Sequence, residues 1–263
     1  MRVKLVVGAI VLFLAAASWL VTDAARGRVP APPAVKARPA PRGVVWRVPV
    51  PTDQKVVALT FDDGPDPVYT PVVLDLARAK GAKFTFFVVG RQGSLYPDII
   101  KRMAAEGHAV ENHTWDHHEM TRLSERQDVS EIELCDSEIT RITGSRPSFM
   151  RPPRGEWDDD VYRATAALGY RVIMWSIELE HHPRRSPQQM AQRAINLARP
   201  GMIILAHDGA VDRHFDRTKT MQALPILVDG LLKKGYRFVT VPELMGMATD
   251  TRQTAEAAPP AAR

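Results

Sequence analysis

Residues 56–65 read Val-Val-Ala-Leu-Thr-Phe-Asp-Asp-Gly-Pro, an apolar run that ends abruptly in two carboxylates and a turn. The apolar run is typical of a strand buried in a parallel sheet. Gly-Pro cannot continue that strand, so the chain must turn directly after Asp62 and Asp63. Chemistry in α/β proteins gathers at the carboxyl ends of strands. This stretch therefore predicts both a fold class and a candidate site.

From residue 56 onward, strand-like and helix-like patterns alternate. Strands are expected at residues 56–61, 83–89, 109–112, 149–151, 171–176, 202–207 and 237–241, and helices at 71–80, 97–106, 124–143, 158–168, 187–198 and 218–234. A glycine falls just past each helical segment, as C-terminal caps do, and Ser124 with Gln127 predicts a capping box. Seven strands alternating with six helices predict a single α/β domain, a barrel or strongly curved sheet of about seven parallel strands.

The two ends of the chain do not resemble the rest of this domain. Residues 1–24 carry a basic start followed by the apolar run 5–21, which indicates an export signal or an N-terminal membrane anchor. The Pro-rich residues 25–52 indicate an extended linker, and the Ala/Thr/Pro-rich residues 248–263 a disordered tail. The catalytic domain is then expected at 53–247, in a protein exported to the periplasm, the cell envelope or the outside of the cell.

The charge distribution argues against a nucleic-acid partner, and the cysteine content argues against a cysteine nucleophile. The chain has a net charge of +5, but its first 43 residues alone carry +6, which leaves the rest close to neutral. Nucleic acid is therefore not an expected partner of the folded domain. The only cysteine, Cys135, lies on an apolar helical stripe and is expected to be a core residue. We expect a monomer.

Unusual polar residues recur at one end of successive predicted strands. They are Asp62 and Asp63 after the first strand, His113 and His117 after the third, Arg151 at the fourth, Glu178 after the fifth, and His207 and Asp208 at the sixth. The carboxyl ends of parallel strands converge on one mouth, where ligands bind. We therefore expect these side chains to form one site.

His113 and His117 have the spacing of a metal-binding pair. On a helical turn, imidazoles four residues apart face the same way, whereas His118 would lie off that face. Asp63 could complete a set of two imidazoles and one carboxylate, leaving Asp62 as a general base. Strand geometry would point Asp62 and Asp63 to opposite faces, and a solvated turn is the alternative for both.

Three further residues have both a catalytic and a structural interpretation. His207 follows a buried run and could be a general acid or a satisfied core histidine. Arg151, followed by two prolines, could pair with Asp62 or form a surface ion pair. Trp175, like Trp115 and Trp157, could stack on a sugar ring, although core packing is the default for each.

These stretches resemble the motifs of the polysaccharide deacetylase family, carbohydrate esterase family four. The matching motifs are residues 60–65, 113–117, 151–155 and 205–207, and the resemblance covers about residues 55–245. It implies a distorted seven-stranded (β/α) barrel. It also implies a metal-dependent N-deacetylase that hydrolyses the acetamide of N-acetylglucosamine-type residues in a cell-envelope or extracellular polysaccharide.

The resemblance also implies a role for each matched residue. Asp62 would be the catalytic base, oriented by Arg151, and His207 the catalytic acid. Asp63, His113 and His117 would bind a divalent metal ion, zinc first, with cobalt or nickel as alternatives. Substrate binding is expected at Arg154, Trp175 and Leu205, with the Arg154 backbone N–H stabilising the oxyanion.

Two departures from the family pattern leave alternatives open. Arg154 stands where the third motif usually has Tyr. The fourth motif usually offers Asp and Trp, but residues 175–182 read Trp-Ser-Ile-Glu-Leu-Glu-His-His, so Glu178 or Glu180 would have to support His207. One alternative is a carbohydrate-binding protein on a degenerate scaffold. The other is a deacetylase or deformylase of a lipid-linked sugar, held at the membrane through residues 5–21.

Overall fold

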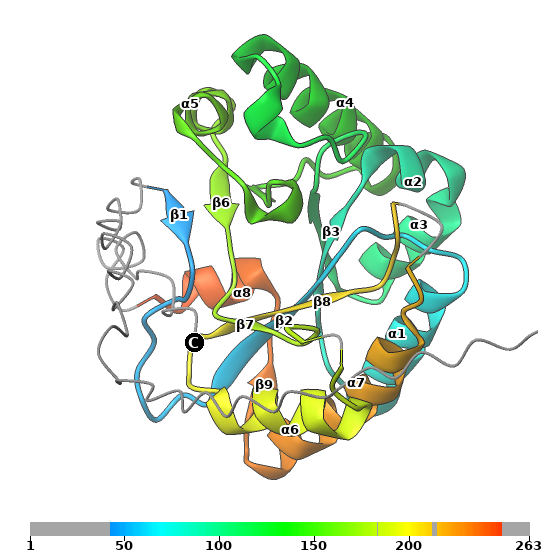
Figure 1. Cartoon of the computed structure of the whole chain (residues 1–263), viewed down its shortest axis with the longest axis vertical. Coiled ribbons are helices and arrows are strands. Elements are labelled where there is room, and N and C mark those ends of the chain that lie inside the picture. Colours follow the sequence, from blue (N-terminus) through cyan, green and yellow to red (C-terminus); the bar gives the residue numbers. More distant parts are fainter. Residues whose placement is uncertain (1–42, 183, 212–214, 249–263) are drawn as a thin grey trace, which may run out of the picture. The chain divides into compact units, whose positions relative to one another are not determined.

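The computed structural model describes residues 43–182, 184–211 and 215–248, and these residues form a curled parallel sheet with helices on its outside (Figure 1). The strands are β1 (Val44–Val45), β2 (Val56–Asp62), β3 (Thr85–Val88), β4 (Ala109–Asn112), β5 (Phe149–Met150), β6 (Arg171–Ile173), β7 (Ile177–Glu178), β8 (Ile203–His207) and β9 (Arg237–Phe238). Their order is β1-β6-β5-β4-β3-β2-β8-β7, with β9 also on β2. Every strand pair is parallel. The expected α/β fold with a curved parallel sheet is therefore confirmed.

Eight helices connect these strands in the described residues. They are α1 (Tyr69–Lys80), α2 (Gly90–Leu95), α3 (Pro97–Ala105), α4 (Glu125–Thr143), α5 (Asp159–Ala167), α6 (Pro187–Leu197), α7 (Thr218–Lys233) and α8 (Val241–Gly246), with short 3-10 turns at η1 (Met120–Arg122) and η2 (Pro153–Gly155). The capping box of Ser124 and Gln127 is present at the start of α4. Gly201 does not cap α6, whose C-cap is Ala198. The Gly201 N–H donates to Val56 O, and its carbonyl accepts from Val48 N.

Two short strands were not expected from the sequence. β1 lies in the Pro-rich stretch interpreted as a linker, yet Val44 and Val45 are buried and pair with β6. The predicted strand at 171–176 ends at Ile173, and the chain then crosses to β7 at the other edge of the sheet. Ser176 joins the two edges, because its hydroxyl donates to Trp46 O at 2.6 Å and its N–H to Ile203 O at 2.8 Å.

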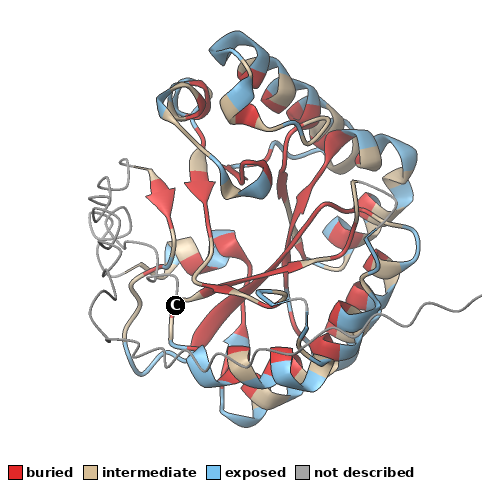
Figure 2. Cartoon of the chain, viewed as in Figure 1, coloured by how far each residue is buried: buried red, intermediate tan, exposed pale blue. Residues whose placement is uncertain are grey.

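The hydrophobic core lies between the strands and the surrounding helices (Figure 2). All seven residues of β2 are buried, and Phe61 stacks on Phe86 with ring centroids 5.3 Å apart. Cys135 of α4 is also fully buried, with its Sγ 3.5 Å from Val88 O, so the expectation of a core residue is confirmed. Burying a large apolar side chain such as that of Phe61 or Phe86 stabilises the fold by roughly 1.5–3 kcal/mol. A rigid sheet therefore fixes the strand ends from which the polar side chains project.

The terminal segments lie outside this description. The expected export signal or anchor falls within residues 1–42, and all but the first residue of the expected tail falls within 249–263, neither of which the structure describes. Among the residues that are described, no helix is both long and apolar enough to cross a bilayer.

Candidate active site

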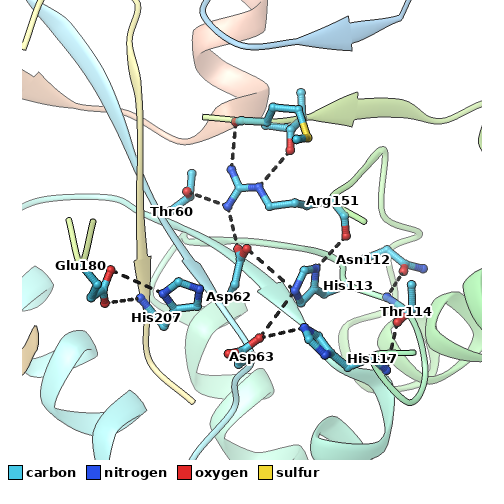
Figure 3. A network of polar contacts seen from close by, with 12 residues as sticks. Thr60, Asp62, Asp63, Asn112, His113, Thr114, His117, Arg151, Glu180 and His207 are labelled. Carbon is cyan, nitrogen blue, oxygen red and sulfur yellow. Dashed lines mark hydrogen bonds and ion pairs between the residues drawn. The ribbon is translucent and has the colours of Figure 1, made fainter. Parts of the chain in front are cut away.

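The strand ends converge on one cavity, as the sequence pattern predicts. Asp62 at the end of β2 is in register with His207 at the end of β8. A cavity of about 460 Å³ opens here. Eight of the nine expected site residues line it: Asp62, Asp63, His113, His117, Arg154, Trp175, Leu205 and His207. Arg151 does not line the cavity but contacts Asp62, which does (Figure 3).

Asp63, His113 and His117 form a cluster suited to a metal ion. Asp63 Oδ1 lies 3.2 Å from His117 Nε2 and 3.6 Å from His113 Nε2. One ligand atom from each residue lies within 4.8 Å of the others. Burial opposes ionisation of Asp63, but the two histidines and the charge of His207 outweigh it and hold the pKa of Asp63 well below its usual value. The donor set is therefore a carboxylate with two imidazoles, which fits a divalent transition metal.

The tautomer of His113 supports the same interpretation. Its Nδ1 lies 2.6 Å from the carbonyl oxygen of Arg151. A carbonyl can only accept, so Nδ1 carries a proton, and in the neutral ring the lone pair is then on Nε2, the atom 3.6 Å from Asp63 Oδ1. A ligating histidine usually has its other ring nitrogen held in this way.

The turn that carries the two histidines is not helical, contrary to the expectation from their spacing. Thr114 and His117 have positive φ values of 68° and 59°. The Asn112 side chain accepts from Thr114 N at 2.8 Å, and Thr114 Oγ1 accepts from His117 N at 3.1 Å. These side-chain bonds replace the helical ladder and hold both imidazoles toward Asp63 (Figure 3).

Asp62 and Asp63 also differ from the strand expectation of opposite faces. The strand ends at Asp62, and Asp63 has a φ of 74°, which turns its side chain back to the side that Asp62 faces. Both carboxylates consequently border the cavity.

Arg151 is fully buried and therefore does not form the alternative surface ion pair. Its Nη1 donates to Asp62 Oδ1 at 2.6 Å and to Thr60 Oγ1 at 2.9 Å. Its Nε and Nη2 donate to the carbonyl oxygens of Ile173 and Met174. Burial lowers the pKa of the guanidinium and the Asp62 carboxylate opposes that effect. Four acceptors thus fix one buried cation against one oxygen of Asp62.

His207 is supported by Glu180 rather than by Glu178. Glu180 Oε2 lies 3.4 Å from His207 Nδ1, an ion-pair distance, and Glu180 Oε1 accepts from His207 N at 3.1 Å and from Thr220 Oγ1 at 2.9 Å. Burial disfavours the imidazolium, but Glu180, with Asp63 and Asp62, raises the pKa of His207 to about 9. Glu178 instead lies 3.7 Å from His181.

Asp208 and Arg217 differ from the expectations drawn from the sequence. Asp208 does not line the cavity and is fully buried, and Thr70 Oγ1 donates to it at 2.6 Å. Burial raises the pKa of Asp208 to about 7. Arg217, which was not expected from the sequence, lines the cavity and donates to Asp63 Oδ2 at 3.0 Å. It lies 154 residues from Asp63 and in no recognised motif, so no local pattern indicates it.

The third-motif turn presents Arg154 at the cavity wall. Arg154 has a φ of 60°, and Gly155 and Glu156 close the turn by donating to Pro152 O and Pro153 O. The Arg154 backbone N–H takes no part in that closure, and its side chain reaches Glu119 with Nε to Oε1 at 3.2 Å.

Comparison with known proteins agrees with this geometry. The family model described as polysaccharide deacetylase matches residues 50–173. Peptidoglycan-N-acetylglucosamine deacetylase of Bacillus cereus is 36% identical over 204 residues, which span 77% of this chain and 92% of that protein. This chain belongs to the polysaccharide deacetylase family.

Further members of the family extend the comparison. Peptidoglycan-N-acetylmuramic acid deacetylase PdaA of Bacillus subtilis is 33% identical, over 74% of this chain and 73% of that protein. The crystal structure of the Bc1960 peptidoglycan N-acetylglucosamine deacetylase superposes with a TM-score of 0.72 at 30% identity, covering 80% of this chain and 95% of that one. The family resemblance expected from the four motifs is confirmed.

Proposed function

We propose that this protein is a metal-dependent N-deacetylase that hydrolyses the acetamide of N-acetylglucosamine-type residues in a cell-envelope or extracellular polysaccharide. The observation that carries the proposal is the arrangement of two kinds of group in one cavity. Asp62 and the cluster of Asp63, His113 and His117 line the same cavity as His207, whose imidazole has Glu180 as its carboxylate partner. Amide hydrolysis needs a base for the attacking water and an acid for the leaving amine, and this cavity offers both.

Asp63, His113 and His117 would hold the metal ion. Three protein ligands leave a further coordination position open, as in catalytic zinc sites, and a metal bound there would polarise the acetyl carbonyl and acidify water. Zinc suits a donor set of two imidazoles and one carboxylate, and cobalt or nickel could replace it.

The chain's own residues would move the protons. Arg151 holds Asp62 Oδ1, while Asp62 Oδ2 lies 3.8 Å from His113 Nε2 at the cluster. These contacts support Asp62 as the base that would accept a proton from the attacking water. His207, kept protonated by Glu180, would donate a proton to the departing amine nitrogen.

The remaining cavity residues would bind the sugar. The Arg154 backbone N–H would donate to the oxyanion as the acetyl carbon becomes tetrahedral. Trp175 and Leu205 line the same cavity and offer apolar surface to the acetyl group and the ring. A cavity of about 460 Å³ is large enough for a sugar residue.

Cell-wall glycan is the substrate class that the relatives favour. The similar proteins are named for peptidoglycan N-acetylglucosamine, peptidoglycan N-acetylmuramic acid and chitooligosaccharide. The export signal or anchor expected in residues 1–24 would place this domain where such glycans occur.

Acetate release tests the proposal against its alternatives. Wild type loaded with zinc or cobalt should release acetate from peptidoglycan or N-acetylglucosamine oligomers, and a chelator should stop it. Asp62→Asn should abolish turnover while leaving glycan binding intact. Equal binding by both proteins without turnover by either would favour the carbohydrate-binding alternative. Turnover confined to lipid-linked sugars would favour the membrane-substrate alternative.

Metal content tests the ligand assignment separately. Asp63→Ala and His113→Ala should each lose the metal, whereas His207→Ala should keep it, because His207 is not one of the clustered ligands. Elemental analysis of the three purified variants distinguishes these cases. Full occupancy in His113→Ala would contradict the assignment.

A further inference from the structure

Arg217 contacts the oxygen of Asp63 that does not face the two histidines. It stands at the N-cap of α7, and its side chain is only 13% exposed. Its Nη2 donates to Asp63 Oδ2 at 3.0 Å, and its Nε donates to Gly209 O at 2.8 Å. The guanidinium also packs over the Phe215 ring, with Cζ 5.3 Å from the ring centroid. These three contacts, to Asp63, Gly209 and Phe215, therefore restrict the position of the Arg217 guanidinium.

The two oxygens of Asp63 consequently have different environments. Oδ1 faces the Nε2 atoms of His117 and His113, whereas Oδ2 is taken by Arg217. The carbonyl that braces Arg217 belongs to Gly209, whose backbone packs directly against Asp63 and Gly64. Asp63 and Arg217 are thus both held by the same closely packed backbone around Gly209.

This arrangement can limit how Asp63 binds a cation. A free carboxylate binds metals through one oxygen or through both. A charge-assisted hydrogen bond to Oδ2 occupies one of its lone pairs and holds the carboxylate in place, which favours binding through Oδ1 alone. Two imidazoles and one oxygen make three ligands, so a coordination position stays open for water and substrate.

The attraction between the Arg217 guanidinium and the Asp63 carboxylate accounts for the contact, but it does not favour metal binding. A guanidinium hydrogen-bonded to a metal ligand repels the cation and so lowers metal affinity. The geometric restriction of the carboxylate is the effect that remains. We propose that Arg217 is a positioning residue that restricts Asp63 to one metal-ligand oxygen, an inference that rests on the metal site proposed above.

The test compares cobalt-loaded wild type with Arg217→Met and Arg217→Lys. Arg217→Met removes the donor to Oδ2, so the second oxygen can join the coordination shell. We expect retained cobalt, weaker visible absorption because the coordination number rises, and kcat lower by about 10–100-fold. Arg217→Lys keeps the positive charge but lacks the planar guanidinium that contacts both Asp63 and Gly209, and it should give intermediate spectra and rates.

Arg102→Met is the matched control. Arg102 also bonds carboxylates, Glu106 at 2.6 Å and Asp75 at 2.7 Å, but does not line the cavity. This variant should keep the wild-type spectrum and kcat, which separates the loss of an arginine ion pair from the loss of the contact to Asp63.

The outcomes that would overturn the proposal are distinct. A wild-type cobalt spectrum in Arg217→Met would show that Oδ2 is not restrained by Arg217. Loss of cobalt from a folded Arg217→Met would show that the contact serves metal binding as such. If wild type itself bound no metal, the proposed metal site would be wrong, and this inference would fall with it.

Discussion

Removing the buried guanidinium of Arg151 should destabilise the protein in a way that depends on the charge of Asp62. Arg151→Met fills much of the same space but leaves Asp62 Oδ1 without the partner that lies at 2.6 Å. The Asp62 side chain is only 5% exposed, so water cannot replace that partner. Thr60 Oγ1 and two carbonyl oxygens lose a donor as well.

The magnitude follows from burial on both sides of the pair. Breaking a buried ion pair by removing one partner costs about 3–5 kcal/mol, because the remaining charge is left uncompensated. At roughly 2–4 °C per kcal/mol for a domain of this size, Tm should fall by about 6–20 °C. Adding Asp62→Asn removes the stranded charge, so the double variant should be more stable than Arg151→Met alone.

Urea unfolding of metal-free wild type, both single variants and the double variant measures the coupling directly. We expect a coupling energy of about 1.5–3 kcal/mol between the two positions. A bound divalent cation should reduce the cost of Arg151→Met, since it offers Asp62 another positive charge. Additive effects, or a cost below about 1 kcal/mol for Arg151→Met, would refute the view that this pair is a buried, mutually dependent unit.

Three other outcomes are expected. The raised pKa of His207 should stabilise metal-free protein by about 3 kcal/mol, a contribution that is complete below pH 6.5 and lost as pH rises through about 9. Glu180→Gln should therefore make the free energy of unfolding less dependent on pH between pH 6 and 10. An unchanged pH dependence in this variant would contradict the pairing of Glu180 with His207. Gly155→Ala should lower both Tm and kcat, because an added Cβ would lie 2.5 Å from the Trp175 ring at a φ of 68°; wild-type values would show that the turn adapts. Because burial raises the pKa of Cys135, its thiol should react with a thiol reagent only in denaturant; rapid labelling of native protein would contradict its place in the core.

The sequence predicts the sheet because its signals are long and repeated. The apolar run of β2 and the 19-residue amphipathic pattern of α4 each span enough residues to identify the element. Alternation of strands and helices then implies parallel pairing, and parallel pairing brings the polar strand ends together. β1 and β7 are two residues each, too short for any periodicity, and they form because neighbouring strands offer unpaired edges.

The site was harder to predict wherever backbone conformation decides the geometry. Spacing places His113 and His117 in one group, but not in the left-handed turn that the Asn112 side chain stabilises. Alternation along a strand would separate Asp62 from Asp63, and only the end of the strand brings them together. Residue propensity does not predict such conformations, because specific hydrogen bonds, such as the one from Thr114 N to the Asn112 side chain, offset their cost.

The altered fourth motif gains a physical explanation once Glu180 is located. A scaffold that had lost its acid catalyst would leave His207 without a carboxylate nearby, and burial would then push its imidazole toward the neutral form. Glu180 instead lies against both the backbone and the ring of His207, and Thr220 of α7 fixes one of its oxygens. The required property is a buried negative charge beside the imidazole, and Glu180 supplies it from this position. The departure in sequence is therefore a weak argument for a degenerate enzyme, because the electrostatic environment that an acid catalyst needs is present.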